Sequence, residues 1–139
     1  MWFDASMVDY EEAIKLGITD AQYEPCIIKD VEHNNDICDE IIAAIRRSRF
    51  IVADSTAGSC AKCDTCDERP ACRTRVKTRG GVYFEAGFAM GLGIPVIWSV
   101  HQDQVEQIHF DTRQYKHIMY AAPDELREKL RHRIEATIH

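Results

Sequence analysis

Residues 78–100 read TRGGVYFEAGFAMGLGIPVIWSV, and this stretch decides the expected fold. Two glycines open a predicted helix, and Gly93 separates that helix from a predicted strand, IPVIWSV. After Arg79 the stretch contains one charged side chain, Glu85, which shares a helical face with the apolar residues at positions 82, 88, 89 and 92. A glycine turn, an apolar helix and a β-branched strand in this order are typical of parallel α/β domains.

The same alternation of strands and helices runs through the rest of the chain. Strands are predicted at residues 1–3, 25–31, 49–55, 94–100 and 115–121. Helices are predicted at residues 7–20, over the isoleucines at 37, 41 and 45, around Glu85, and at residues 124–139. The pattern therefore predicts one three-layer α/β domain, residues 1–139, in which helices cover a mainly parallel five-stranded sheet.

Composition limits the classes of protein to which the chain can belong. The 139 residues suffice for one hydrophobic core, and a formal net charge of −6 does not favour binding of a nucleic acid polymer. Because the chain has neither an apolar run of roughly 20 residues nor a signal-peptide pattern, no membrane contact is expected and the predicted location is the cytoplasm. The six cysteines are then expected to be thiols or metal ligands rather than disulfides.

Acidic residues follow the predicted strands at the places where parallel sheets carry their sites. Asp4 follows the first strand, Asp54 comes directly after RFIVA near the end of the strand at 49–55, and Glu85 follows the Gly80-Gly81 turn. Burial would raise the pKa of Glu85, whereas a position in the first turn of a helix would favour its charged form. A desolvated but ionised carboxylate of this kind suits a nucleophile, and a solvent-facing or salt-bridged glutamate on a partly exposed helix is the alternative interpretation.

Three blocks of the sequence resemble the nucleoside 2-deoxyribosyltransferase-like superfamily: RGGVYFEAGFAMGLGIPVIW, RFIVADST and HFDTRQYKHI. The resemblance covers nearly the whole chain and implies a flavodoxin-like fold. It implies that Glu85 attacks the anomeric carbon of a (deoxy)ribosyl group and that Asp54 assists with proton transfer or binds the sugar. Substrate contacts are expected from residues in or near these blocks: Phe3, Asp4, Gly80, Gly81, Tyr83, Ser99, His109 and Asp111.

Some of these residues have an equally good structural interpretation. Ser99 can be a buried strand serine, and the segment with His109 and Asp111 can be a solvated loop. A homodimer or a higher oligomer is expected, because a small domain with a short first strand leaves its pocket open.

The expected reaction is cleavage of the N-glycosidic bond of a nucleoside or nucleotide. A carboxylate next to the anomeric carbon can stabilise an oxocarbenium-like transition state or trap the sugar covalently. Water then completes a hydrolysis, and a second base completes a transfer. Two alternatives remain open: an NAD-cleaving enzyme of the TIR type, and a non-catalytic module that senses nucleotides.

A cysteine-rich segment, SCAKCDTCDERPACRTRVKTR, belongs to a predicted insertion at about residues 55–79. Its cysteines follow the pattern C-x2-C-x2-C-x5-C: Cys60, Cys63, Cys66 and Cys72. Four thiolates at this spacing favour a closed, structural zinc site, with an iron–sulfur cluster as the runner-up and free thiols as a third interpretation. The expected glycosidase chemistry itself needs no cofactor.

Overall fold

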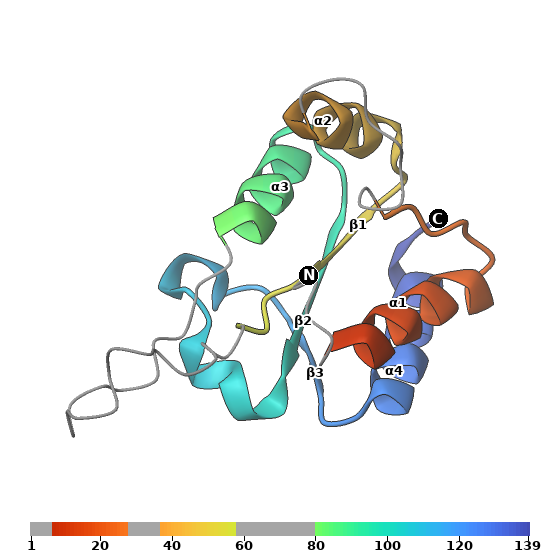
Figure 1. Ribbon diagram of the computed structural model, residues 1–139, viewed down its shortest axis with the longest axis vertical. Coiled ribbons are helices and arrows are strands. Elements are labelled where there is room, and N and C mark those ends of the chain that lie inside the picture. Colours follow the sequence, from red (N-terminus) through yellow and green to blue (C-terminus); the bar gives the residue numbers. More distant parts are fainter. Residues whose placement is uncertain (1–6, 28–36, 58–79) are drawn as a thin grey trace.

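The computed structural model describes residues 7–27, 37–57 and 80–139 (Figure 1). The helices are α1 (Val8–Asp20), α2 (Ile37–Arg47), α3 (Gly80–Gly91) and α4 (Pro123–Thr137). The strands are β1 (Ile51–Asp54), β2 (Val96–His101) and β3 (Ile118–Tyr120). Two short 3-10 helices follow β2, namely η3 (Gln102–Gln107) and η4 (Phe110–Thr112). The four predicted helices and the last three predicted strands are therefore confirmed.

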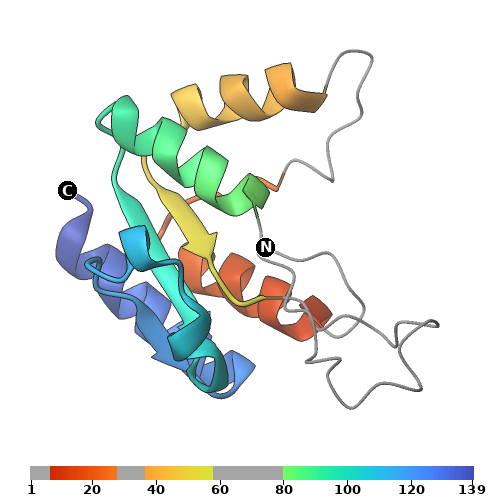
Figure 2. The same ribbon diagram turned by 90° about the vertical axis from the view of Figure 1, so that its left-hand side faces the viewer.

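The strands form a parallel sheet in the order β1-β2-β3. Helices α2 and α3 lie on one side of the sheet, and α1 and α4 lie on the other (Figure 2). The register pairs Asp54 with Ser99 and Ser99 with Ile118. Because parallel strands end at a common edge, the polar residues at the ends of β1 and β2 lie side by side.

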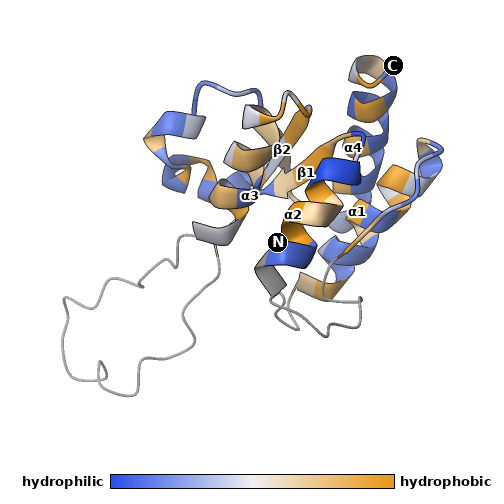
Figure 3. Cartoon of the chain, turned by 90° about the horizontal axis from the view of Figure 1, so that it is seen from above, coloured by the Kyte–Doolittle hydropathy of each residue, from blue (hydrophilic) through white to orange (hydrophobic). Residues whose placement is uncertain are grey.

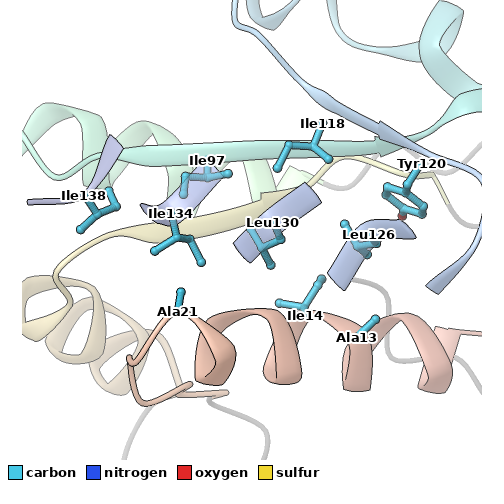
Figure 4. Packing of buried hydrophobic residues seen from close by; sticks show 10 residues of the cluster. All are labelled: Ala13, Ile14, Ala21, Ile97, Ile118, Tyr120, Leu126, Leu130, Ile134 and Ile138. Carbon is cyan, nitrogen blue, oxygen red and sulfur yellow. The ribbon is translucent and has the colours of Figure 1, made fainter. Parts of the chain in front are cut away.

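The larger hydrophobic cluster lies between the sheet and the pair α1 and α4 (Figure 4). Leu126, Leu130 and Ile134 recur every four residues along α4, and all three are fully buried. Ile97 and Ile118 of the sheet meet them from the opposite side. The amphipathic pattern predicted for the closing helix is thus the pattern that packs it against the sheet.

The second cluster lies between the sheet and α3. Val82 and Ala86 of α3 pack on Ala53 and Trp98 of the strands. Since neighbouring strand residues point to opposite faces, Ile97 joins the α4 side while Trp98 joins the α3 side. This alternation fixes which side of the sheet carries Glu85 and its helix.

Five strands are not seen in the described part of the chain, where the sheet has three. The predicted first strand, residues 1–3, lies outside the described residues, as do residues 28–31 of the second. Residues 25–27, which are described, form no strand. Pro25 has no N–H group to donate to a neighbouring strand, so the apolar pattern alone does not produce a ladder there.

Candidate functional site

The carboxyl ends of the three strands are joined by a buried hydrogen-bond network centred on Asp54. This side chain is 1% exposed. Its Oδ2 accepts hydrogen bonds from the Ser99 hydroxyl at 2.7 Å and from the Tyr120 hydroxyl at 2.8 Å. Its Oδ1 accepts one from the backbone N–H of Thr56 at 3.2 Å. The structure therefore brings together two predicted site residues, Asp54 and Ser99.

Thr56 extends this network in one direction. Its Oγ1 lies 2.8 Å from the Tyr120 hydroxyl and accepts a hydrogen bond from His101 N–H at 2.8 Å. Because the single Tyr120 proton is donated to Asp54, the Thr56 hydroxyl is the donor to Tyr120. The resulting chain runs from His101 through Thr56 and Tyr120 to the carboxylate, and such chains strengthen their members.

Neither Thr56 nor Tyr120 was among the predicted site residues. For Thr56 a local signal exists, since an aspartate commonly accepts a hydrogen bond from the backbone N–H two residues later. Tyr120 ends β3, 66 positions from Asp54 along the chain, and carries no such signal. It reaches the carboxylate only because β3 lies in the same parallel sheet as β1.

Glu85 lies in a different environment from Asp54. It belongs to α3, which packs on one face of the sheet. Its side chain is half-buried, and burial raises the pKa of the Glu85 carboxyl above its ordinary value of 4.5. The prediction that it lies in the first turn is wrong, because Gly80 and Gly81 are themselves helical and Glu85 falls in the second turn of α3. Desolvation, rather than a helix terminus, is therefore the largest influence on this carboxyl.

A cavity of about 490 Å³ borders Glu85. It lies beside β1 and is lined mainly by apolar side chains, among them Ile14, Ile18, Ile41 and Ile45. Among the described residues that line it, none comes from β2 or β3. Glu85 thus borders a largely apolar cavity, whereas Asp54 is held in the network at the strand ends.

An aromatic cluster lies between α3 and the sheet. Trp98 stacks on Tyr115 with ring centres 5.9 Å apart and an interplanar angle of 10°. Tyr83 lies 6.0 Å from Trp98 and 5.8 Å from His109. The His109 backbone N–H also donates to the Tyr83 hydroxyl at 3.3 Å, so these two predicted site residues are brought together. Trp98 is buried, so the rings that a nucleobase could stack on are those of the half-buried Tyr83 and the exposed His109.

His109 and Asp111 also interact locally. The His109 Nδ1 accepts a hydrogen bond from the Asp111 N–H at 3.4 Å and lies 3.4 Å from the Asp111 carboxylate. His109 is the residue that caps η4, and both side chains are exposed. The structure therefore gives this pair a capping function and leaves both groups accessible at the rim of the aromatic cluster.

His117 adds an acceptor that the sequence did not indicate. Its Nδ1 lies 2.9 Å from the Tyr115 carbonyl oxygen, which can only accept, so Nδ1 carries the proton of the neutral ring. Burial lowers the pKa of His117, and its ring lies 5.5 Å from that of Trp98. The buried Nε2 has no hydrogen-bond partner among the described residues. The neutral ring therefore keeps one buried nitrogen that can act as a hydrogen-bond acceptor.

Several predicted site residues lie outside the described residues: Phe3, Asp4, Cys60, Cys63, Cys66 and Cys72. Within the described ranges, no group of three or more His, Cys, Asp or Glu side chains is arranged to hold a metal ion. The structure therefore describes the carboxylates and the aromatic cluster, while the cysteine site stays a prediction.

The helices of residues 7–27, 37–57 and 80–139 include none with the length and apolar character needed to cross a bilayer. Comparisons with known proteins give no match: no family model, no curated protein and no solved structure matches the chain.

Proposed function

We propose that the protein cleaves or transfers the N-glycosidic bond of a nucleoside or nucleotide, with Glu85 as the nucleophile. The observation that supports this most is the placement of a half-buried carboxyl against a largely apolar cavity. A carboxylate that has lost part of its hydration is a stronger nucleophile and a better stabiliser of a positively charged sugar. The resemblance to the nucleoside 2-deoxyribosyltransferase-like superfamily, with its five-stranded flavodoxin-like sheet, belongs to the same proposal.

The proposed reaction has two steps. A Glu85 oxygen forms a bond to the anomeric carbon while the bond to the base nitrogen breaks, and the bonding electron pair leaves with the base, which takes up a proton. Water or a second base then attacks the same carbon and displaces the Glu85 carboxylate. In this proposal Asp54 assists with proton transfer or binds the sugar, which requires that its carboxylate, 1% exposed and bound by the Ser99 and Tyr120 hydroxyls, become accessible to the substrate.

The aromatic cluster would hold the base in this proposal. Tyr83 lies on α3, two residues before Glu85, and its ring lies beside those of Trp98 and His109. Since residues two apart point to different sides of a helix, the substrate in this proposal would span from this cluster to the side of α3 that carries Glu85. Because every base has an aromatic face, stacking alone does not select one base over another.

The decisive experiment incubates the purified protein with a panel of nucleosides, nucleotides and deoxynucleotides and measures the released base by chromatography. Glu85→Gln should reduce turnover by about 10⁴-fold or more, because it removes the nucleophilic charge at nearly constant volume. Glu128→Gln is the matched control, since Glu128 is an exposed residue of α4 and should leave turnover unchanged. Full activity in Glu85→Gln would exclude the mechanism.

Two further arms address the alternative functions. Release of nicotinamide from NAD, without base release from deoxynucleotides, would assign the TIR-type activity instead. A nucleotide that binds to the wild-type protein and equally well to Glu85→Gln, with turnover in neither, would identify a sensing module.

A further inference from the structure

A second stripe of residues runs along helix α4, beside the stripe that is buried. In Figure 3 the ribbon of α4 is largely in the blue of hydrophilic residues. Positions 129, 132, 133 and 136 follow helical spacing, so their side chains lie on one face of α4. This face and β3 line a groove of about 390 Å³, which is called the α4 groove below. Its lining includes Lys129, His132, Arg133 and Ala136 of α4 and Ile118 and Met119 of β3.

The charged side chains that line the α4 groove are basic. Its ionisable residues are lysine, arginine and histidine, and no Asp or Glu of the described ranges lines it. The whole chain, by contrast, has 23 Asp and Glu residues against 17 Lys and Arg. A cationic groove on a protein of net negative charge attracts anions locally.

Arg133 provides the charge that is left for such an anion. The other Lys and Arg residues of α4 each lie 2.6–2.9 Å from a carboxylate oxygen, namely Arg127, Lys129 and Arg131. Arg133 forms no ion pair with any described residue. Its NH1 donates a hydrogen bond to the Lys116 carbonyl oxygen at 3.1 Å, and its side chain is half-buried. The guanidinium is therefore held in place by a neutral group that does not cancel its charge.

Two neighbours of Arg133 in the groove have further N–H groups. The Lys129 ammonium donates to the Met119 carbonyl oxygen at 2.9 Å and to the Glu125 carboxylate, which leaves one of its three donors. The His132 Nε2 lies 2.7 Å from Arg131 NH2, which can only donate, so the proton of the neutral His132 ring is on Nδ1. Because their bonds to the β3 segment and to α4 hold these groups, little ordering is needed when a ligand binds.

The remaining lining of the groove is apolar. Met119 is 53% exposed, and Ala136 is an exposed residue with a small side chain. Binding sites for small molecules commonly combine an apolar wall with a few polar groups that fix the orientation of the ligand. The α4 groove has both parts, so it suits an anion that also carries an apolar group.

We propose that the α4 groove binds a small organic anion, whose phosphate or carboxylate group pairs with the Arg133 guanidinium and whose apolar part lies against Met119 and Ala136. The planar guanidinium matches two oxygens of either group at once, which is why the two groups share this chemistry. The groove has no lining residue in common with the cavity beside β1 or with the hydrogen-bond network of Asp54. The proposal is therefore independent of the reaction assigned to Glu85.

The first test titrates the full chain with phenyl phosphate and, separately, with benzoate, and follows the backbone amides by NMR. Shift changes should cluster at residues 116–119 and 129–136. Arg133→Gln should weaken binding at least about tenfold, because it removes a charged hydrogen-bond donor. Arg127→Gln is the matched control. It removes the same charge from the same helix but does not line the groove, so binding should stay within about twofold of wild type.

The two probes also identify the anionic group. Tighter binding of phenyl phosphate assigns the groove to phosphate esters, and tighter binding of benzoate assigns it to carboxylates. Circular dichroism and thermal unfolding of each variant separate loss of binding from loss of the fold.

The second test fills the apolar part of the groove without changing its charge. Ala136→Leu should weaken the binding of phenyl phosphate, since the larger side chain takes up the space of the phenyl ring. The same variant should bind inorganic phosphate as the wild type does. This variant keeps the proposal testable even if Arg133→Gln does not fold.

Three results would overturn the proposal. The first is the absence of saturable shift changes with either probe up to about 10 mM. The second is a folded Arg133→Gln or Ala136→Leu variant that binds phenyl phosphate as tightly as the wild type. The third is a set of shift changes confined to residues 54–57 and 99–101, which would place the anion at the strand ends instead.

Discussion

At the scale of single residues, burial of the Glu85 carboxyl, the proposed nucleophile, has a cost for stability. Because burial raises its pKa, the folded protein binds a proton at this carboxyl more tightly than the unfolded chain does. The stability that this group contributes is therefore fully present below its unfolded pKa, near 4.5, and is lost as the pH rises through its folded pKa. At neutral pH the ionised carboxylate destabilises the fold, as is common for groups at functional sites.

We therefore expect Glu85→Gln to be more stable than the wild-type protein at neutral pH. The difference should shrink as the pH falls and should vanish once Glu85 is protonated in both states. Urea unfolding over this pH range measures it, with Glu128→Gln on the exposed side of α4 as the control. Equal stability of Glu85→Gln and wild type at every pH would show that the Glu85 carboxyl is not desolvated.

The Tyr120 hydroxyl is the second residue whose contribution can be measured. It donates a hydrogen bond to Asp54 and accepts one from the Thr56 hydroxyl. Tyr120→Phe therefore leaves the buried Asp54 carboxylate and the buried Thr56 hydroxyl each with one hydrogen-bond partner fewer. Loss of a partner in a buried network costs about 1–3 kcal/mol of unfolding free energy. Tyr10→Phe is the matched control, because the Tyr10 hydroxyl makes an exposed contact of 3.5 Å and its loss should cost less than about 0.5 kcal/mol.

At the scale of elements, the contact between α1 and α4 depends on a glycine. A Cβ placed at Gly17 would lie 2.9 Å from the backbone oxygen of Arg127, which belongs to α4. Backbone cannot rotate away as a side chain can, so a methyl group here must push the two helices apart. The close approach lets Leu130 and Ile134 reach the cluster that they share with Ala13 and Ile14 of α1.

Gly17→Ala should therefore destabilise the protein by about 1–3 kcal/mol, even though alanine is the better helix former. Gly80→Ala tests the alternative that any glycine substitution has this effect, since a Cβ at Gly80 meets nothing within 4 Å. Its unfolding free energy should stay within about 0.5 kcal/mol of the wild-type value. Chemical denaturation of the two variants decides the matter. A stable Gly17→Ala would mean that α1 and α4 can separate without cost.

At the scale of the whole molecule, the cysteine-rich insertion would fold around a metal. We propose that Cys60, Cys63, Cys66 and Cys72, which lie outside the described residues, bind one structural zinc ion. A segment with few apolar residues cannot form its own core, and metal binding can supply the missing folding energy. Four thiolates leave zinc no open position for a substrate.

Elemental analysis should accordingly find about one zinc per chain. Cys63→Ser should lower this content and loosen residues 55–79 toward proteolysis. Cys26→Ser should leave the zinc content unchanged, because Cys26 is an exposed free cysteine on the segment after α1. Absorption in the visible range would indicate an iron–sulfur cluster instead of zinc. Metal-free protein with an ordered insertion would contradict the proposal of a metal centre.

Local patterns in the sequence were sufficient to predict the helices and strands that the structure describes. The leucines and isoleucines of α4 recur every four residues, and the β-branched runs at β1 and β2 are bounded by glycine, proline and acidic residues. These signals depend on neighbours along the chain, which is why four helices and three strands were predicted correctly. Residues 25–27 form no strand although their sequence is apolar, because Pro25 has no N–H group to donate to a neighbouring strand.

The sequence by itself thus determined the alternation of elements, the parallel α/β class and the position of Asp54 at the end of a strand. Only the tertiary structure decided that Tyr120 reaches Asp54, that Tyr83 meets His109, and that Glu85 borders a cavity while Phe84 beside it faces solvent. These outcomes depend on which residues far apart in the chain become neighbours. Periodicity shows which face of a helix is apolar, but not what packs against it.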